Sequence, residues 1–251
     1  MKKILVRGDD LGYSRAVNYG IYDTVHDGIN NNVGVMVNMP STEQGLELLK
    51  NEDVSLGMHT DISNGRPVSD PKDIPSLVDD NGCFKRSKIY RHASKDFVVL
   101  DQVVQEIEAQ YQKFLDLVGE KPSYFEGHAV QSANFVKGLE IVAKRHNLAY
   151  LPFSGNDVIP FKHSKLMPFC ESMLPNYQPM ETFKKMIKIA DKDSDVIPFM
   201  ICHPGYLDEY ILNTSSLTFP RPKEVELLCS QEVRDLIAEH GIELVKYCEI
   251  E

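Results

Sequence analysis

Short apolar runs alternate with longer stretches of helical periodicity along the chain. Residues 3–6 form an apolar, β-rich run, and Ser14 can cap a helix in which Val17, Ile21 and Val25 recur at helical spacing. Later segments repeat this order. The pattern predicts further strands at 33–37, 54–58, 124–125, 149–151, 196–202 and 242–245, and further helices at 42–49, 99–117, 135–146, 180–190, 224–228 and 231–240.

This succession of strand and helix, repeated about six or seven times, predicts an α/β fold with a parallel sheet. The pattern allows either a barrel or an open, doubly wound sheet. The 251 residues suit one large domain, so we expect a single domain over 1–251. Residues 64–96 are rich in Pro, Gly, Asp and Ser, which predicts a long loop excursion. Residues 152–179 contain five prolines and are expected to be irregular.

Acidic side chains outnumber basic ones, with 37 Asp and Glu against 27 Lys and Arg, for a formal net charge of −10. This balance argues against a nucleic-acid partner, because phosphate backbones require a basic face, and it gives no reason to expect a membrane partner. The first apolar run ends at Arg7, too early for a signal peptide. Five cysteines without CxxC spacing fit buried thiols better than disulfides or a thiolate zinc site. We therefore expect a cytoplasmic protein.

Polar clusters follow directly on four of the predicted strands. They are Asp9-Asp10, His59-Thr60-Asp61, Glu126-Gly127-His128 and His203-Pro204-Gly205. Because the carboxyl ends of parallel strands lie on one face of a sheet, we expect these clusters to converge. One aspartate and two histidines can bind a divalent cation and leave positions open for water and substrate. A remaining carboxylate could take a proton from the attacking water, and a remaining histidine could protonate a leaving group, as metal-assisted hydrolysis requires.

Structural explanations compete with this one. A single histidine at a strand end is more often structural than a ligand, and an isolated Asp-Asp pair is usually a turn or a cap. A nucleophilic pair of Cys202 and His203 is disfavoured, because neighbours on a strand point to opposite faces. The sequence contains no GxxxxGK[ST], GxGxxG or GxSxG motif. The pattern alone leaves a metal site and a structural role equally open.

The motifs themselves carry a family resemblance. The segments 7–14 (RGDDLGYS), 57–61 (GMHTD), 126–128 (EGH) and 202–206 (CHPGY) follow one another as in the YdjC-like carbohydrate deacetylases, the chitooligosaccharide deacetylase family. The likeness covers nearly the whole chain. It implies a deformed, TIM-like (β/α) barrel of about seven parallel strands. It also implies a metal-dependent hydrolase that removes the N-acetyl group from amino-sugar oligosaccharides, such as diacetylchitobiose or its phosphate, and that can form homodimers.

The resemblance assigns roles to individual residues. It implies that Asp10, His59 and His128 bind one divalent metal ion, that Asp9 is the general base, and that His203 is the general acid or steadies the tetrahedral intermediate. The family points to Mg²⁺, whereas one carboxylate and two imidazoles also suit Zn²⁺ or Mn²⁺. Further candidates for substrate binding are Asp61, Arg66, Glu126, Tyr206 and Arg221.

Several alternatives stay open at this point. Asp61 and Glu126 also fit a supporting role behind the ligands, and Arg66 and Arg221 fit either an anionic sugar substituent or an ordinary surface position. Glu126 stands where the family usually has Asp, so substrate preference can differ. Another metal-dependent barrel hydrolase, such as a phosphoesterase or amidohydrolase, and a non-catalytic sugar-binding protein are the alternative functions.

Overall fold

One sheet organises the fold of this computed structural model, which describes residues 2–152, 155 and 157–250. Its strands follow the order β4-β3-β2-β1-β7-β6-β5, and β8 pairs with β1. The bounds of the strands are Lys2–Leu11 (β1), Asn32–Val35 (β2), Ser55–Thr60 (β3), Phe125–Gly127 (β4), Ile159–Phe161 (β5), Ser164–Phe169 (β6), Val196–Cys202 (β7) and Ile242–Leu244 (β8).

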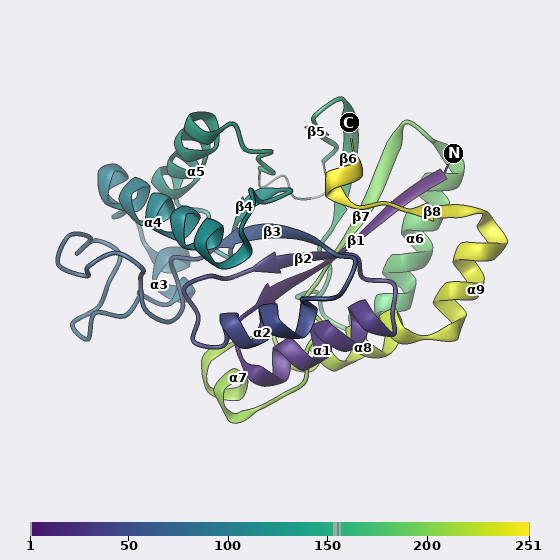
Figure 1. Cartoon of the computed structure of the whole chain (residues 1–251), viewed down its shortest axis with the longest axis horizontal. Coiled ribbons are helices and arrows are strands. Elements are labelled where there is room, and N and C mark those ends of the chain that lie inside the picture. Colours follow the sequence, from purple (N-terminus) through teal and green to yellow (C-terminus); the bar gives the residue numbers. More distant parts are fainter. Residues whose placement is uncertain (1, 153–154, 156, 251) are drawn as a thin grey trace.

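Helices surround this sheet (Figure 1). Helices α4 and α5 pack together beside β3 and β4, whereas α1, α2 and α8 lie along the opposite side of the molecule, and α6 and α9 lie near the N-terminus (Figure 1). Their bounds are Arg15–His26 (α1), Thr42–Leu49 (α2), Ser87–His92 (α3), Leu100–Val118 (α4), Ala133–His146 (α5), Pro179–Lys192 (α6), Glu209–Thr214 (α7), Pro220–Cys229 (α8) and Gln231–His240 (α9), with a 3₁₀ turn at Tyr247–Glu249.

The sheet is mostly parallel and curls into a half-barrel. Strand β1 is its centre, and Ile4, Leu5 and Val6 in this strand are fully buried. Every pair among the strands is parallel except β5–β6, which is antiparallel. The expected barrel-like α/β class is therefore confirmed, with one antiparallel hairpin added to the parallel strands.

The structure confirms the predicted helix start at Ser14 and differs from the expected elements at 149–151 and 64–96. The Ser14 side chain accepts a hydrogen bond from the Val17 backbone at 3.3 Å, so α1 starts where the capping residue predicts. The expected strand at 149–151 is reduced to one bridge between Tyr150 and Phe125. The predicted loop at 64–96 contains the short helix α3 and a bridge between Val78 and Phe84.

The expectation that 152–179 is irregular is wrong for the described residues that form β5 and β6. Each strand contains a proline, and proline cannot donate a ladder hydrogen bond. Pro160 lies in β5, at the end of the strand order, and Pro168 lies beyond Leu166, where the pairing of β6 with β5 stops. On the side of each proline that has no paired strand, no backbone N–H is needed for a ladder hydrogen bond. The strands therefore tolerate both prolines.

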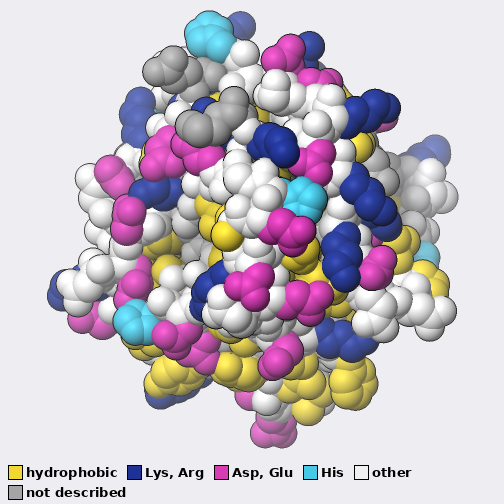
Figure 2. Space-filling model, turned by 90° about the vertical axis from the view of Figure 1, so that its right-hand side faces the viewer, with side chains coloured by type: hydrophobic (Ala, Val, Ile, Leu, Met, Phe, Trp, Pro, Cys, Tyr) yellow, Lys and Arg dark blue, Asp and Glu magenta, His cyan; other side chains and the backbone are white. Residues whose placement is uncertain are grey.

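The surface agrees with the charge balance of the sequence. On the face drawn in Figure 2, acidic and basic side chains are interspersed, without a wide basic area.

Among the described residues, no helix combines the length and the apolar character that a membrane crossing requires.

Candidate active site

The end of β1 brings two neighbouring carboxylates to the same cavity. Between Gly8 and Leu11 the pairing of β1 with β2 gains one residue, which is a β-bulge, and Asp10 has a φ of 78°. Neighbours on a regular strand face opposite sides, so this irregularity allows Asp9 and Asp10 to line one cavity of about 420 Å³. Aspartate tolerates the left-handed region better than most residues.

Asp9 is 1% exposed and is held by an arginine of the same strand. Arg7 Nη2 donates to Asp9 Oδ2 at 2.7 Å, while Asp9 Oδ1 has no hydrogen-bond partner among the described residues. Burial raises the pKa of Asp9, and the charges of Arg7 and His59 oppose that rise. Gly34 in β2 makes room for Asp9, since a Cβ atom there would lie 2.4 Å from Asp9 Oδ1.

Asp10 is fully buried and pairs with a different arginine. Arg221 Nη2, from α8, donates to Asp10 Oδ2 at 2.6 Å. Burial by itself would raise the pKa of Asp10, but Arg221 and the hydrogen bonds to His128 and His59 hold it well below its usual range. Asp10 therefore stays ionised and presents its second oxygen, Oδ1, to the two histidines.

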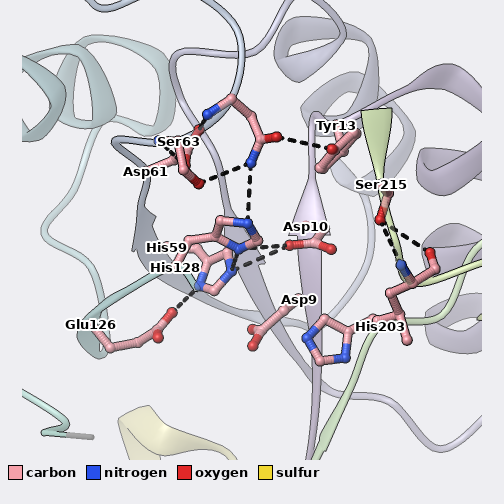
Figure 3. A network of polar contacts seen from close by, with 12 residues as sticks. Asp9, Asp10, Tyr13, His59, Asp61, Ser63, Glu126, His128, His203 and Ser215 are labelled. Carbon is pink, nitrogen blue, oxygen red and sulfur yellow. Dashed lines mark hydrogen bonds and ion pairs between the residues drawn. The ribbon is translucent and has the colours of Figure 1, made fainter. Parts of the chain in front are cut away.

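Asp10, His59 and His128 point toward one another from three strand ends (Figure 3). Asp10 Oδ1 lies 3.2 Å from His59 Nε2 and 3.4 Å from His128 Nδ1, and these two nitrogens are 2.8 Å apart. All three atoms lie within 4.8 Å of one another, close enough to share a metal ion. One carboxylate oxygen and two imidazole nitrogens suit Zn²⁺ or Mn²⁺, so the donor set fits a divalent metal.

Glu126 and Asn64 contact the ring nitrogens of His59 and His128 that do not face Asp10. The Nδ1 atom of His59 contacts the Glu126 carboxylate, and histidines that bind metals commonly donate their second ring N–H to a carboxylate. Asn64 Nδ2 lies 3.2 Å from His128 Nε2, and Tyr13 Oη donates to Asn64 Oδ1 at 3.0 Å. Asp9, His59 and Glu126 also lie within 4.8 Å of one another, but Arg7 already pairs with Asp9 and lies 3.8 Å from Glu126.

His203 reaches the cavity from the end of β7. Its Nδ1 atom lies 3.3 Å from Ser172 Oγ, and its backbone N–H donates to Glu224 Oε2 at 2.6 Å. Burial lowers the pKa of His203 to about 3, so the ring is neutral near pH 7. The preceding Cys202 is fully buried in the core, so the two neighbours face opposite sides of the sheet as expected.

The structure places the remaining sequence candidates around this centre. Asp61 is fully buried, and its Oδ1 accepts from the Ser63 backbone at 2.8 Å while its Oδ2 accepts from the Asn64 backbone at 2.9 Å, so it shapes the loop that carries Asn64. Arg66 is exposed and lies outside the cavity lining. Tyr206, also outside the lining, donates its hydroxyl to Asp23 at 2.5 Å.

Sequence reasoning missed three residues that hold the site together. Arg7 lies two positions before Asp9, and the period of two along a strand is a signal that it shares the Asp9 face. Glu224 lies three positions after Arg221, which on a helix puts both on one face. Asn64 lies in the predicted loop at 64–96, and the sequence pattern does not identify it because its contact with His128 depends on the tertiary fold.

The fold and the site together define a half-barrel α/β protein with a carboxylate–histidine centre at the strand ends. Residues 3–239 match the model of the YdjC-like protein family, and the chain belongs to this family. It is 32% identical to a carbohydrate deacetylase of Clostridium beijerinckii over 99% of this chain and 100% of that one. It is 27% identical to carbohydrate deacetylase 2 of Listeria innocua, covering 99% and 98% of the two chains. The expected family is confirmed.

Solved structures agree on the fold. An Enterococcus faecalis protein, described as a proposed cellobiose-phosphate cleavage protein, superposes with a TM-score of 0.83 at 23% identity over 98% of this chain and 97% of that one. A family 4 acetyl xylan esterase from Clostridium thermocellum, solved with a cobalt ion, gives a TM-score of 0.53 at 12% identity over 99% and 89%. At these identities the likeness concerns the fold.

Replacing Gly34 tests how tightly β2 constrains the site. A new Cβ atom would lie 2.4 Å from Asp9 Oδ1 and 3.2 Å from His59 Cβ. We expect Gly34→Ala to destabilise the protein by roughly 1–3 kcal/mol through overpacking. We also expect it to weaken Mn²⁺ binding at least about tenfold by displacing His59. Urea unfolding and isothermal titration calorimetry measure the two effects.

Gly119→Ala is the control for a mere loss of stability. Gly119 has a φ of 86°, and a Cβ atom added there would meet no other atom within 4 Å, so the substitution strains the backbone at the end of α4 only. Its Mn²⁺ affinity should equal that of the wild type. If Gly34→Ala also binds Mn²⁺ like the wild type, β2 does not constrain the site in this way.

Proposed function

We propose that the protein is a carbohydrate N-deacetylase that hydrolyses the acetamide group of an amino sugar. The observation that carries this proposal is the convergence of Asp10, His59 and His128 on one point, with Asp9 in the same cavity. The names of the relatives from Clostridium beijerinckii and Listeria innocua support the same activity. The acetyl xylan esterase of similar fold supports deacetylation on this scaffold.

Asp10, His59 and His128 would hold one divalent metal ion, which polarises the acetyl carbonyl and lowers the pKa of water when bound. Glu126 orients the His59 ring, so that its Nε2 lone pair faces the cavity. The donor set favours Zn²⁺ or Mn²⁺ over Mg²⁺, which prefers oxygen ligands.

Asp9 is placed to act as the general base. Its Oδ1 atom is buried without a hydrogen-bond partner among the described residues, so it is free to accept a proton from the attacking water. Arg7 holds the other oxygen at 2.7 Å and thereby fixes the carboxylate while the proton moves. The same carboxyl group can then return this proton to the departing sugar nitrogen, leaving acetate and an amine.

His203 is better suited to steady the oxyanion than to act as the general acid. With a pKa of about 3, the ring carries no excess proton near neutral pH. If Ser172 donates its hydroxyl to Nδ1, across a separation of 3.3 Å, the proton of the neutral ring resides on Nε2. That N–H can donate to the tetrahedral oxyanion, as preorganised donors do in acyl-transfer enzymes.

The cavity fits a substrate larger than one acetamide group. Its volume of about 420 Å³ lies within the range of small-molecule pockets, and apolar side chains such as Leu151, Met173 and Phe199 line it beside the polar centre. Exposed Arg91 on α3 also lines it. We therefore propose a short amino-sugar oligosaccharide such as diacetylchitobiose, and a phosphate on that sugar would meet Arg91 rather than Arg66.

An acetate-release assay tests the proposed function. The enzyme is incubated with N-acetylglucosamine, diacetylchitobiose and diacetylchitobiose phosphate, then with EDTA, and then with added Zn²⁺, Mn²⁺ or Mg²⁺. We expect acetate from at least one sugar, its loss in EDTA and its recovery with metal, at about one bound ion per chain. Absence of acetate from every sugar would refute the proposal, and two bound ions per chain would favour a phosphoesterase.

Asp9→Asn tests the general base. We expect turnover to fall about 10²–10⁴-fold because the proton acceptor is lost, while metal affinity stays within a few-fold of the wild type. Asp10→Asn is the matched control and should lose the metal itself. Calorimetric titration with Mn²⁺ separates the two variants. Loss of metal in Asp9→Asn, with retention in Asp10→Asn, would exchange the roles of the two carboxylates.

Two substitutions of His203 distinguish an oxyanion donor from a general acid. We expect His203→Ala to lower kcat about 10²–10³-fold with the metal retained, because one preorganised donor is lost. His203→Gln should recover part of this loss, since a neutral amide N–H can still donate. Equal loss of kcat in both variants would point instead to proton transfer by His203, and normal turnover in His203→Ala would remove this residue from the mechanism.

A further inference from the structure

Helix α8 carries two charged side chains that are as buried as the core. Arg221 is 1% exposed and Glu224 is 0% exposed, and residues three positions apart on a helix are neighbours. Charged side chains are almost never fully buried unless they are paired or hydrogen-bonded. The partners of these two side chains therefore indicate what α8 contributes.

Glu224 uses both carboxylate oxygens. Oε2 accepts from the His203 backbone N–H at 2.6 Å, and Oε1 accepts from the Tyr177 hydroxyl at 2.9 Å. Burial raises the pKa of Glu224 to about 7, although both hydrogen bonds oppose the rise. Whatever its protonation state, Glu224 places a hydrogen-bond acceptor at a fixed position against the His203 backbone N–H.

Arg221 connects the backbone of the same residue, His203, to Asp10. Its Nη1 donates to the His203 carbonyl oxygen at 3.3 Å and its Nη2 donates to Asp10 Oδ2 at 2.6 Å. Its Nε donates to the Leu217 carbonyl at 2.9 Å. All three nitrogens thus bond to protein acceptors, which leaves Arg221 poorly placed to recognise a sugar substituent.

We propose that Arg221 and Glu224 are positioning residues that hold the His203 backbone on both sides of its Cα and fix it relative to Asp10. Glu224 accepts from the His203 N–H, and Arg221 donates to the His203 C=O, so both peptide groups that flank the His203 Cα are held. Because Arg221 also takes Asp10 Oδ2, only Oδ1 faces His59 and His128. One helix thereby sets the separation between the metal-binding half of the site and the oxyanion-binding half.

The kinetic part of this inference rests on the proposed deacetylase activity. Glu224→Leu removes the acceptor, whereas Glu224→Gln retains one, because the amide oxygen can accept from His203 and the amide N–H can donate to Tyr177. Glu226 lies two positions away on α8 and is exposed, so Glu226→Leu and Glu226→Gln are matched controls. For all variants, kcat, KM, Mn²⁺ affinity and hydrogen exchange of the His203 amide are measured.

We expect Glu224→Leu to lower kcat about 10–100-fold, with KM and Mn²⁺ affinity within about twofold of the wild type. The His203 amide should exchange at least about tenfold faster, because its acceptor is lost. Glu224→Gln should restore kcat and amide protection to within about threefold of the wild type, and both Glu226 variants should be unchanged. A purely structural role would instead lower stability without this split between kcat and KM.

The inference is overturned if Glu224→Leu matches Glu226→Leu in kcat and in His203 exchange, or if Glu224→Gln is as defective as Glu224→Leu. If Glu224→Leu does not fold, Arg221→Lys tests the inference in its place. The matched control is Lys223→Arg, because Lys223 is exposed on the same helix. A lysine keeps the charge beside Asp10 but cannot make all three bonds, so kcat should fall at least about tenfold. If the wild type releases no acetate, the proposed function fails. Hydrogen exchange of the His203 amide then tests by itself whether Glu224 and Arg221 hold the His203 backbone.

Discussion

Asp9 and Asp10 lie next to each other, both are buried, and like charges this close repel unless each is neutralised. The fold supplies a separate cation for each carboxylate. Arg7 comes from the same strand, and Arg221 comes from a position 211 residues after Asp10. Each arginine takes one oxygen of its carboxylate, so Asp10 Oδ1 is left facing His59 and His128, and Asp9 Oδ1 is left without a hydrogen-bond partner among the described residues. The different roles proposed for Asp9 and Asp10 depend on this division of partners.

The bulge in β1 is the backbone feature that lets Asp9 and Asp10 face the same cavity. A regular strand would send one of the two carboxylates to the opposite face of the sheet. The extra residue and the left-handed conformation of Asp10 instead aim both into one cavity, at a conformational cost of about 1–3 kcal/mol that the surrounding contacts offset. Neighbouring β2 is adapted to the same arrangement, since Gly34 has no Cβ atom that would clash with Asp9 Oδ1.

The parallel topology made much of the site predictable. Asp10 and His59 are among the last residues of β1 and β3, and His128 and His203 directly follow β4 and β7, so the expectation that strand ends converge placed all four at one cavity. The strands β5 and β6 were not predicted, because prolines usually exclude strands and the tolerance of Pro160 and Pro168 depends on which neighbouring strands are present. Arg221 was expected either to contact an anionic sugar substituent or to lie at the surface, and the structure instead buries it against Asp10, where it also lines the cavity.

The sequence by itself determined most of the strand and helix order, the cap at Ser14 and the polar side chains at the strand ends, because periodicity and residue chemistry act locally. Tertiary structure alone decided that Arg221 neutralises Asp10, that Asp9 and Asp10 line one cavity, and that α8 holds the His203 backbone. Those outcomes depend on burial and on contacts between segments far apart in the chain. The residues next to a position in the sequence do not determine its burial or its distant contacts, so these outcomes are seen only in the folded chain.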